Sequence, residues 1–369
     1  KTFGGNGDDV AHSVQETTDG GYIVAGYTTS FGDVDPDVYV LKLNSDGSLA
    51  WQKTFGGSSW DNAYSIQQTT DGGYIVAGYI TSFVVLNADV YVLKLNSDGS
   101  LAWEKTFGGS GSDLAISIQQ TTDGGYIVAG YTDSFGAGGS DAYVLKLNSD
   151  GSLAWQKTFG ESGHDRAYSI QQTTDDGYIV AGYIDKFGAD NYDIYILKLN
   201  SDGSLAWEKT FGGSGSDHAY SIQQTTDGGY IVAGSTASFG AGWEDAYVLK
   251  LNSDGSLAWQ KTFGGQYSDE ACSIQQTTDG GYIVAGYTGS FGAGNGDVYV
   301  LKLNPDGSLA WQKTFGGTRS DYAYSIQQTA DGGYIVAGDT SSFGKLSAYY
   351  YYDVYILKLD SNGELHPFE

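Results

Sequence analysis

The sequence predicts an all-β fold, a seven-bladed β-propeller with four antiparallel strands in each blade. A unit of 52 residues recurs seven times, and its copies begin at Lys1, Lys53, Lys105, Lys157, Lys209, Lys261 and Lys313. Each copy contains four short runs in which apolar residues alternate with polar or small ones, and Gly, Asp, Asn or Ser bounds each run. Four such strands in about fifty residues match the size of one propeller blade.

The second copy shows the four strands in order, at residues 63–68, 74–79, 90–95 and 101–107. Aromatic and β-branched residues fill these runs, as expected for strands buried on a face. The links TTDGG and NSDGS join the first strand to the second and the third to the fourth, and both predict tight Asp-Gly turns. The predicted recurring core, written for this copy, is Tyr74, Ile75, Val76, Leu93, Leu95, Trp103 and Phe107.

The other two links vary between copies. One joins the second strand to the third (SFGAGGSD in the third copy), and the other leads from the fourth strand into the next copy (GGSGSD). In a propeller these links lie on the face opposite the uniform turns. The sequence therefore predicts one uniform face and one variable face, and loops that vary on a rigid scaffold are where binding surfaces are usually built.

The motifs DGGYIVAG, DVYVLKLNSDG and W-x-KTFGG recur in most copies, whereas the signatures of kelch and WD repeats are absent. The unit resembles the Gly-rich propeller repeats of secreted and surface proteins in bacteria and archaea, and the resemblance covers the whole chain. It implies an extracellular or cell-surface location and a binding or structural role, and it names no substrate.

Residues 1–369 are expected to form a single propeller domain whose ring is closed by both ends of the chain. The chain begins with KTFGG and ends with GELHPFE, and residues 363–369 followed by residues 1–5 make one nearly complete fourth strand. This closure predicts that the Lys1 amino group lies near the Glu369 carboxylate. In the alternative, residues 1–5 complete the last blade of a neighbouring molecule, which would produce an open polymer by strand exchange.

The formal net charge of −26 argues against binding to nucleic acid or to anionic membranes, because both require a basic face. No apolar run approaches the ~20 residues of a membrane-spanning helix, so membrane insertion is not expected. Cys272 is the one cysteine, which excludes an internal disulfide, and the chain has no methionine. This composition and a start at lysine suit a processed, secreted chain in an oxidising exterior.

No catalytic motif is present, and the protein is expected not to be an enzyme. The four histidines, which lie in four different copies, are interpreted as packed or solvated side chains and not as metal ligands (His12, His164, His218 and His366). Two of them, His12 and His218, fall near the expected mouth of the channel. Cys272 takes a position that is Tyr in most copies and is interpreted as a buried small residue. No cofactor is expected, although a calcium ion bridged by residues of the Asp61 and Asp89 positions is kept as an option.

The candidate binding residues are the polar and aromatic departures from the repeat on the variable face: Trp60, His164, Arg166, Tyr192, His218, Trp243, Tyr267, Arg319, Tyr322, Tyr349, Tyr350, Tyr351 and Tyr352. Exposed Trp and Tyr offer large, rigid contact area for proteins or sugar rings. The first hypothesis is therefore binding of a protein or glycan partner. The second is a self-assembling subunit of an extracellular filament or surface layer, and the third is an enzyme with its site at the channel mouth.

Overall fold

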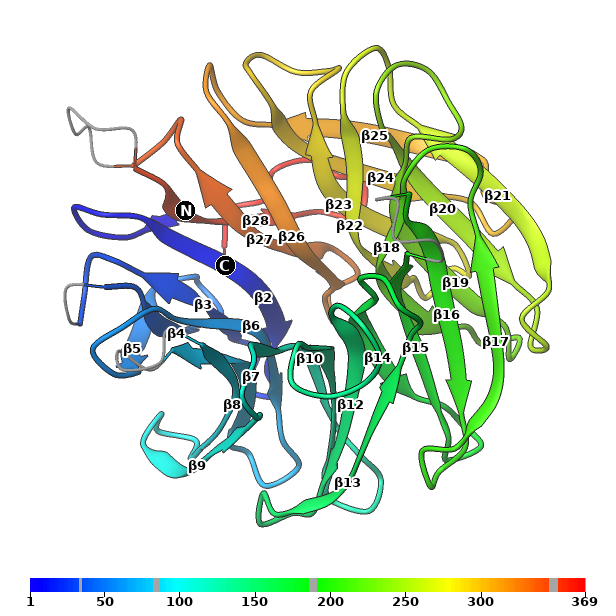
Figure 1. The fold of residues 1–369 in the computed structure, drawn as a ribbon. Helices are drawn as coiled ribbons and strands as arrows, with labels where there is room; N and C mark the ends of the chain where they lie inside the picture. The colour runs from blue at the N-terminus through cyan, green and yellow to red at the C-terminus, as the bar shows by residue number, and fades with distance from the viewer. Residues whose placement is uncertain (33–34, 82–86, 186–190, 345–350, 369) are drawn as a thin grey trace.

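The computed structural model describes residues 1–32, 35–81, 87–185, 191–344 and 351–368. These residues form twenty-eight strands and no helix. The strands pair into seven four-stranded antiparallel sheets arranged around a central channel (Figure 1). The predicted seven-bladed β-propeller is thus confirmed.

Each blade uses four consecutive strands, except the last, which takes its outer strand from the start of the chain. From the channel outward the blades are β2 (Asp9–Glu16), β3 (Tyr22–Thr28), β4 (Asp37–Leu43) and β5 (Leu49–Phe55); β6 (Asp61–Gln68), β7 (Tyr74–Thr81), β8 (Ala88–Leu95) and β9 (Leu101–Phe107); β10 (Asp113–Gln120), β11 (Tyr126–Thr132), β12 (Asp141–Leu147) and β13 (Leu153–Phe159); β14 (Arg166–Gln172), β15 (Tyr178–Ile184), β16 (Asp193–Leu199) and β17 (Leu205–Phe211); β18 (Asp217–Gln224), β19 (Tyr230–Thr236), β20 (Asp245–Leu251) and β21 (Leu257–Phe263); β22 (Asp269–Gln276), β23 (Tyr282–Thr288), β24 (Asp297–Leu303) and β25 (Leu309–Phe315); and β26 (Asp321–Gln328), β27 (Tyr334–Thr340), β28 (Asp353–Leu359) and β1 (Thr2–Phe3).

Side-chain hydrogen bonds join each inner strand to the next around the ring. The amide N–H of Gln68 donates to Oε1 of Gln15 in the preceding blade at 2.6 Å, and the same bond recurs at the other blade junctions. Between the last blade and the first, the N–H of Glu16 donates to Oε1 of Gln327 at 2.7 Å. The ring is therefore closed at its centre by the same contact that joins its other blades.

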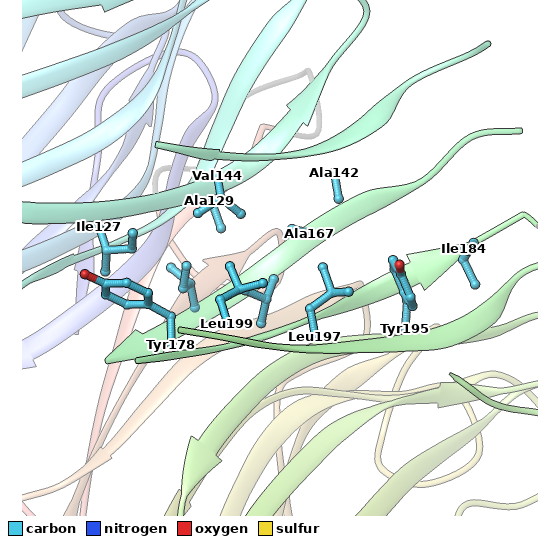
Figure 2. Packing of buried hydrophobic residues seen from close by; sticks show 12 residues of the cluster. Ile127, Ala129, Ala142, Val144, Ala167, Tyr178, Ile184, Tyr195, Leu197 and Leu199 are labelled. Carbon is cyan, nitrogen blue, oxygen red and sulfur yellow. The ribbon is translucent and has the colours of Figure 1, made fainter. Parts of the chain in front are cut away.

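The hydrophobic core lies between blades. One cluster joins β11 and β12 to β14, β15 and β16, and its side chains point from both sheets into the space between them (Figure 2). Of the predicted core, Ile75 and Leu95 are fully buried, whereas Trp103 and Phe107 are only partly buried against it. Since each cluster needs two blades, stability depends on blade-to-blade packing.

Each inner strand contains a bulge at the same position of the repeat. In the third blade Ala115 pairs with Gly130 and Ser117 pairs with Ala129, so Ile116 has no partner of its own. A bulge re-aims the side chain of the extra residue and brings the backbone of its strand toward the neighbouring one. A Cβ atom on Gly130 would lie 1.8 Å from the carbonyl oxygen of Leu114, which explains why glycine stands opposite every bulge.

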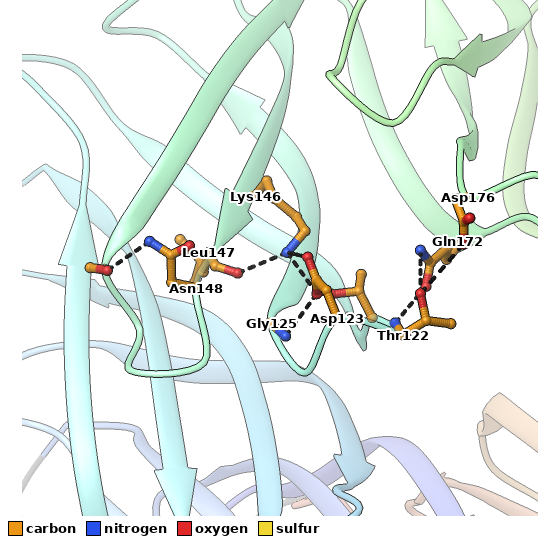
Figure 3. Close-up of polar contacts among 10 residues, drawn as sticks. Thr122, Asp123, Gly125, Lys146, Leu147, Asn148, Gln172 and Asp176 are labelled. Carbon is orange, nitrogen blue, oxygen red and sulfur yellow. Dashed lines mark hydrogen bonds and ion pairs between the residues drawn. The ribbon is translucent and has the colours of Figure 1, made fainter.

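The uniform face is built from side chains that hold the turns in place. Figure 3 shows Lys146 Nζ, 2.9 Å from Oδ2 of Asp123, also donating to the carbonyl oxygen of Leu147 at 3.1 Å. Asp123 in turn accepts the N–H of Gly125 at 2.9 Å. Each of the seven blades has the same Lys–Asp ion pair. The side chains of this face thus hold the turns through ion pairs and hydrogen bonds, which accounts for their uniformity.

Both ends of the chain contribute to the outer edge of the last blade. β1 pairs with β28, with Thr2 opposite Tyr355, and Leu365 forms a bridge with Leu359. The Lys1 amino group donates to the carbonyl oxygen of Ile356 at 2.7 Å. The expected proximity of this amino group to the Glu369 carboxylate concerns a residue outside those described.

Candidate functional site

The variable face carries a ring of side chains around the mouth of the channel, called the mouth ring below. Its members are the seven bulge residues of the inner strands: His12, Tyr64, Ile116, Tyr168, Tyr220, Cys272 and Tyr324. At the other end of the channel the lining consists of the repeated Ile and Gln residues of the same strands, with Val at one place. The two ends of the channel therefore differ, because only one of them varies between blades.

Two residues before each bulge the seven blades carry seven different residues: Val10, Asn62, Leu114, Arg166, His218, Glu270 and Tyr322. Hydrophobic, amide, cationic, imidazole, anionic and phenolic side chains are all represented. Neighbouring positions of the same strand are almost constant, for example the alanine that follows. The chain is therefore least symmetric at the channel mouth.

A cavity of about 410 Å³ lies at this mouth, which is within the size range of small-ligand sites. It is lined by all members of the mouth ring together with Leu114, Tyr131, Arg166 and Glu270. The guanidinium of Arg166 lies over the ring of Tyr131, 4.0 Å from its centroid. The cavity thus combines tyrosine walls with one cationic and one carboxylic side chain.

Two carboxyl groups in this region are held partly protonated near neutral pH. Burial, reinforced by Glu244, raises the pKa of Glu270 to about 7. Burial also raises the pKa of Asp339 to about 7, although a hydrogen bond with Tyr324 opposes the shift. A group that changes its protonation near neutral pH makes this region sensitive to pH.

The histidines and the cysteine of this region are packed against other side chains. Burial lowers the pKa of His12 to about 4, and the ring of His12 lies 4.9 Å from that of Tyr64 and 5.1 Å from that of Tyr324. Burial also lowers the pKa of His218 and raises that of the Cys272 thiol. His12 and His218 are therefore neutral at pH 7, and the thiol is not ionised.

Buried polar atoms without a hydrogen-bond partner are concentrated at this end of the molecule. Among the described residues five such atoms occur, and four belong to the channel-mouth region: Oδ1 of Asn62, Nε of Arg166, Nδ1 of His218 and Oδ1 of Asp339. Native proteins leave few buried polar groups unpaired, and each one asks for an explanation such as a missing ligand or water.

Three predicted residues expose large aromatic rings farther out on the variable face. Trp60 is 60% exposed and borders a cavity of about 380 Å³ together with Tyr27, Tyr79 and Asn62. Trp243, 75% exposed, and Tyr267, 56% exposed, border a common cavity of about 350 Å³. The structure thus brings Trp243 and Tyr267 together and leaves Trp60 on another part of the face.

The remaining predicted residues fall into smaller groups. Tyr192 lies beside His218, with ring centroids 5.5 Å apart. Tyr322 stacks on Tyr287 at 4.6 Å and lies 6.5 Å from Tyr352. Tyr351 is 39% exposed, and Tyr349 and Tyr350 are outside the described residues.

His164 and Arg319 both contact neighbouring loops and lie outside the cavity at the channel mouth. His164 accepts the N–H of Ser140 at 3.2 Å, and Arg319 donates to the carbonyl oxygen of Ser341 at 3.3 Å. Among the predicted site residues that the structure describes, Arg166 alone lines that cavity.

Several residues that line the cavity were missed by the sequence prediction, notably Tyr131, Tyr168, Tyr220, Glu270 and Tyr324. All of them lie within strands, whereas the prediction looked for function in the loops. The position two residues before each bulge carries a different residue in each of the seven copies. Comparing the copies at this position would have identified the set that includes Arg166 and Glu270.

The described residues contain no group of three or more His, Cys, Asp or Glu side chains placed to hold a metal ion. The residues considered for calcium do meet in pairs between blades. Asp89 of one blade and Asp113 of the next lie on two sides of Gly108, whose Cβ, if present, would be 2.0 and 2.6 Å from their oxygens. Asp113 already accepts the N–H of Gly109 and hydroxyl hydrogens from Thr132 and Ser134.

We expect the stability of the protein to be greatest near pH 4. Burial raises the pKa of several paired carboxyl groups, that of Asp141 to about 6, so these groups destabilise the fold as pH rises above 4. In the turns, burial of Asp123 is outweighed by hydrogen bonds from Thr121, Lys146 and Gly125, which lower its pKa to about 2. That stabilisation is lost as pH falls from 4 to 2.

Urea unfolding midpoints at pH 2 to 8, measured in EDTA, test this expectation. A midpoint that rises steadily up to pH 8 would contradict it. The same series in calcium separates two explanations of the paired carboxyl groups, because a midpoint raised at pH 8 by calcium alone would mean that the pairs bind this ion.

Comparison with known proteins places these features in context. Five segments match the family model described as a domain of unknown function (DUF5122) beta-propeller, at residues 17–49, 121–153, 174–205, 225–257 and 277–309. The chain is also 24% identical over 249 residues to the regulatory protein FlaEY of Caulobacter vibrioides, a match that covers 60% of this chain. The chain spans only 26% of the length of that relative.

Solved structures resemble the fold at low sequence identity. Sqt1 of Chaetomium thermophilum bound to the N-terminus of the ribosomal protein L10 is 13% identical and matches with a TM-score of 0.53 over 91% of this chain and 84% of its own. A second structure of Sqt1 is 12% identical and matches with a TM-score of 0.53 over 99% of this chain and 84% of its own. The S511A mutant of puromycin hydrolase, 12% identical, matches with a TM-score of 0.60 over all of this chain and 54% of its own. At this identity the likeness concerns the fold alone. Together with the closed ring of seven four-stranded sheets, the comparisons show that this chain is a seven-bladed β-propeller repeat protein.

Proposed function

We propose that this chain is a non-enzymatic, extracellular binding module that holds a protein partner on its variable face. One observation carries the proposal: seven near-identical blades present seven different residues at one position of the channel mouth, while the opposite face is uniform. Variation concentrated on one face favours a single asymmetric contact surface. The scarcity of cysteine and the absence of methionine are in keeping with an oxidising, extracellular location.

A protein partner fits the spread of exposed aromatic rings better than a glycan does. Trp60 lies at the junction of the first and second blades. Trp243 and Tyr267 lie at the junction of the fifth and sixth blades. A contact that reaches both groups must cross the channel mouth, which favours a broad protein surface over a few sugar rings. Sqt1 with its bound L10 segment is one protein of this fold that holds a polypeptide.

An enzymatic function is less well supported. The partly buried His12 and His218 are neutral and packed among aromatic rings, which suits neither a nucleophile's base nor a metal site. The fold also occurs in puromycin hydrolase, but that match extends over only about half of the hydrolase chain.

Self-assembly, the second hypothesis, is less favoured because β1 lies in the last blade of its own chain. In this position residues 1–5 are not free to complete a neighbouring molecule. Light scattering separates the two hypotheses, since a partner-binding module is expected to be monomeric across a range of concentrations, whereas an assembling subunit grows with concentration.

Alanine substitutions on the variable face are expected to weaken partner capture. The variants W60A, W243A and Y267A each remove an exposed ring, and we expect each to lower the amount of captured partner at least about 10-fold. The assay immobilises the purified protein, exposes it to the extracellular fraction of the source organism and identifies what is retained by mass spectrometry. L153A is the matched control, because Leu153 is an exposed apolar residue that follows a turn of the uniform face. Equal capture by all four variants would contradict the proposal.

A further inference from the structure

Arg166 is a partly buried cation that makes no ion pair with any carboxylate of the described residues. Its guanidinium lies over Tyr131, and its buried Nε atom has no hydrogen-bond partner. Removing one partner from a buried ion pair costs several kcal/mol, so buried charges are normally paired. Arg166 therefore has the environment of one half of an ion pair.

The buried lysines of the described residues show how this fold normally holds a cation away from solvent. The seven buried lysines of the uniform face are all paired with aspartates, as Lys146 is with Asp123 at 2.9 Å. The chain has 44 acidic and 18 basic residues, so carboxylates are abundant. In a chain so rich in carboxylates, Arg166 has no carboxylate partner among the described residues. We infer that it can pair with an anion from another molecule.

The cavity around Arg166 limits what this anion can be. At about 410 Å³ it takes a side chain or a chain end but not a folded surface. Its walls are the rings of Tyr64, Tyr131, Tyr168 and Tyr220 with the apolar side chains of Leu114 and Ile116. Such walls favour a flat or aromatic group, and a planar guanidinium favours a carboxylate, which it can bind through two parallel hydrogen bonds.

We propose that the channel-mouth cavity binds a carboxylate of the partner, an acidic side chain or a C-terminal carboxylate, with Arg166 as its receptor. The proposal rests on the proposed function and names the chemistry by which the partner is recognised. The aromatic rings farther out, such as Trp60 and Trp243, then contact the surface around the inserted group.

Glu270 makes this site dependent on pH. It lines the same cavity, and its pKa of about 7 is set by burial and by Glu244. The other titratable groups that interact with it are the thiol and phenol groups of Cys272, Tyr220, Tyr287 and Tyr322. A bound carboxylate raises the pKa of Glu270 further, so binding takes up a proton. The affinity for an anion therefore increases as pH falls from 8 to 6, and the affinity for a cation would decrease.

The test uses small probes on the full chain. N-acetyltyrosine carries a carboxylate beside an aromatic ring, N-acetyltyrosinamide is its neutral counterpart, tyramine is a cation and glucuronate is a sugar carboxylate. Binding is followed at pH 6 and pH 8 by ligand-detected NMR. We expect N-acetyltyrosine to bind at least 10-fold more tightly than each of the others at pH 6, and more tightly at pH 6 than at pH 8.

Variants assign this binding to Arg166. R166Q is expected to weaken the binding of N-acetyltyrosine at least 10-fold, whereas R319Q, which removes an arginine outside the cavity, leaves it unchanged. E270Q keeps the neutral form of the side chain and is expected to hold the affinity at pH 6 within 2-fold while reducing the difference between pH 6 and pH 8. If R166Q does not fold, the four probes and E270Q still decide the question on folded protein.

The proposal is overturned if the amide or tyramine binds as tightly as N-acetyltyrosine, or if R166Q retains the affinity of the wild type. Tighter binding of glucuronate would also overturn it, by pointing to a sugar ligand. Each of these results would contradict the carboxylate site without contradicting the variable face as the binding surface. If no carboxylate binds but W60A and W243A still lose their partner, the variable face remains the binding surface and only the role of Arg166 is wrong.

Discussion

G130A is expected to lower the free energy of unfolding by about 3 kcal/mol. The added methyl group would lie 1.8 Å from the carbonyl oxygen of Leu114 and 3.0 Å from the Cα atom of Ala115. Both atoms belong to the backbone of the bulged strand β10, so no flexible side chain can move aside. The bulge, which aims Ile116 into the channel, must therefore shift. The expected result is a lower urea midpoint with an unchanged slope of the free energy of unfolding against urea concentration.

The matched control is G57A. No atom lies within 4 Å of a Cβ placed on Gly57, and its backbone is not in the left-handed region, so alanine is expected to be neutral or slightly stabilising there. If G130A unfolds at the wild-type midpoint, then the inner strands do not carry the bulge that builds the mouth ring.

Deletion of residues 1–5 is expected to lower the free energy of unfolding by about 4 kcal/mol and to cause self-association. The deletion removes β1, with the paired hydrogen bonds between Lys1 and Ile356 and the packing of Phe3 against the first and last blades. It also exposes the outer edge of β28, and an exposed strand edge is a template for pairing with another chain. Urea unfolding and light scattering on the same sample measure the two effects.

F3A separates the contribution of the side chain from that of the strand. It keeps the backbone pairing of Thr2 and Phe3 with β28, so it is expected to destabilise by about 2 kcal/mol and to leave the protein monomeric. A deletion variant that is monomeric and as stable as the wild type would mean that β1 contributes nothing to the closure of the last blade.

Most of the fold could be predicted from the repeat because its Asp-Gly turns and alternating strands recur with fixed spacing. The largest differences in the second blade are strand ends: β6 begins at Asp61 and β8 at Ala88, each two residues before the prediction, and β7 ends at Thr81, two residues after it. These residues are polar or small and do not continue the apolar alternation. They join the strands because Asp61 and Asp89 both pair with Ile80, and Ala88 pairs with Thr81.

The site was harder to predict because it depends on the bulges. An alternating pattern gives the two faces of a strand but does not show where an extra residue enters it, so the pattern does not single out Tyr168 and Tyr220. The pairing that positions Arg166 over Tyr131 also joins residues of adjacent blades, which the sequence of one repeat cannot reveal. By contrast, the exposed Trp60, Trp243 and Tyr267 were found from sequence, because they lie in links that vary between copies.

The central claim, that the variable face is the binding surface, is tested most directly by hydrogen–deuterium exchange of the protein with and without its captured partner. The account predicts slower exchange in the links before Asp61, Asp245 and Asp269 and in the inner strands at Arg166 and Glu270. It predicts no change in the turns at Thr122 and Asn148 on the uniform face. Protection of those turns, with the channel mouth unaffected, would contradict it.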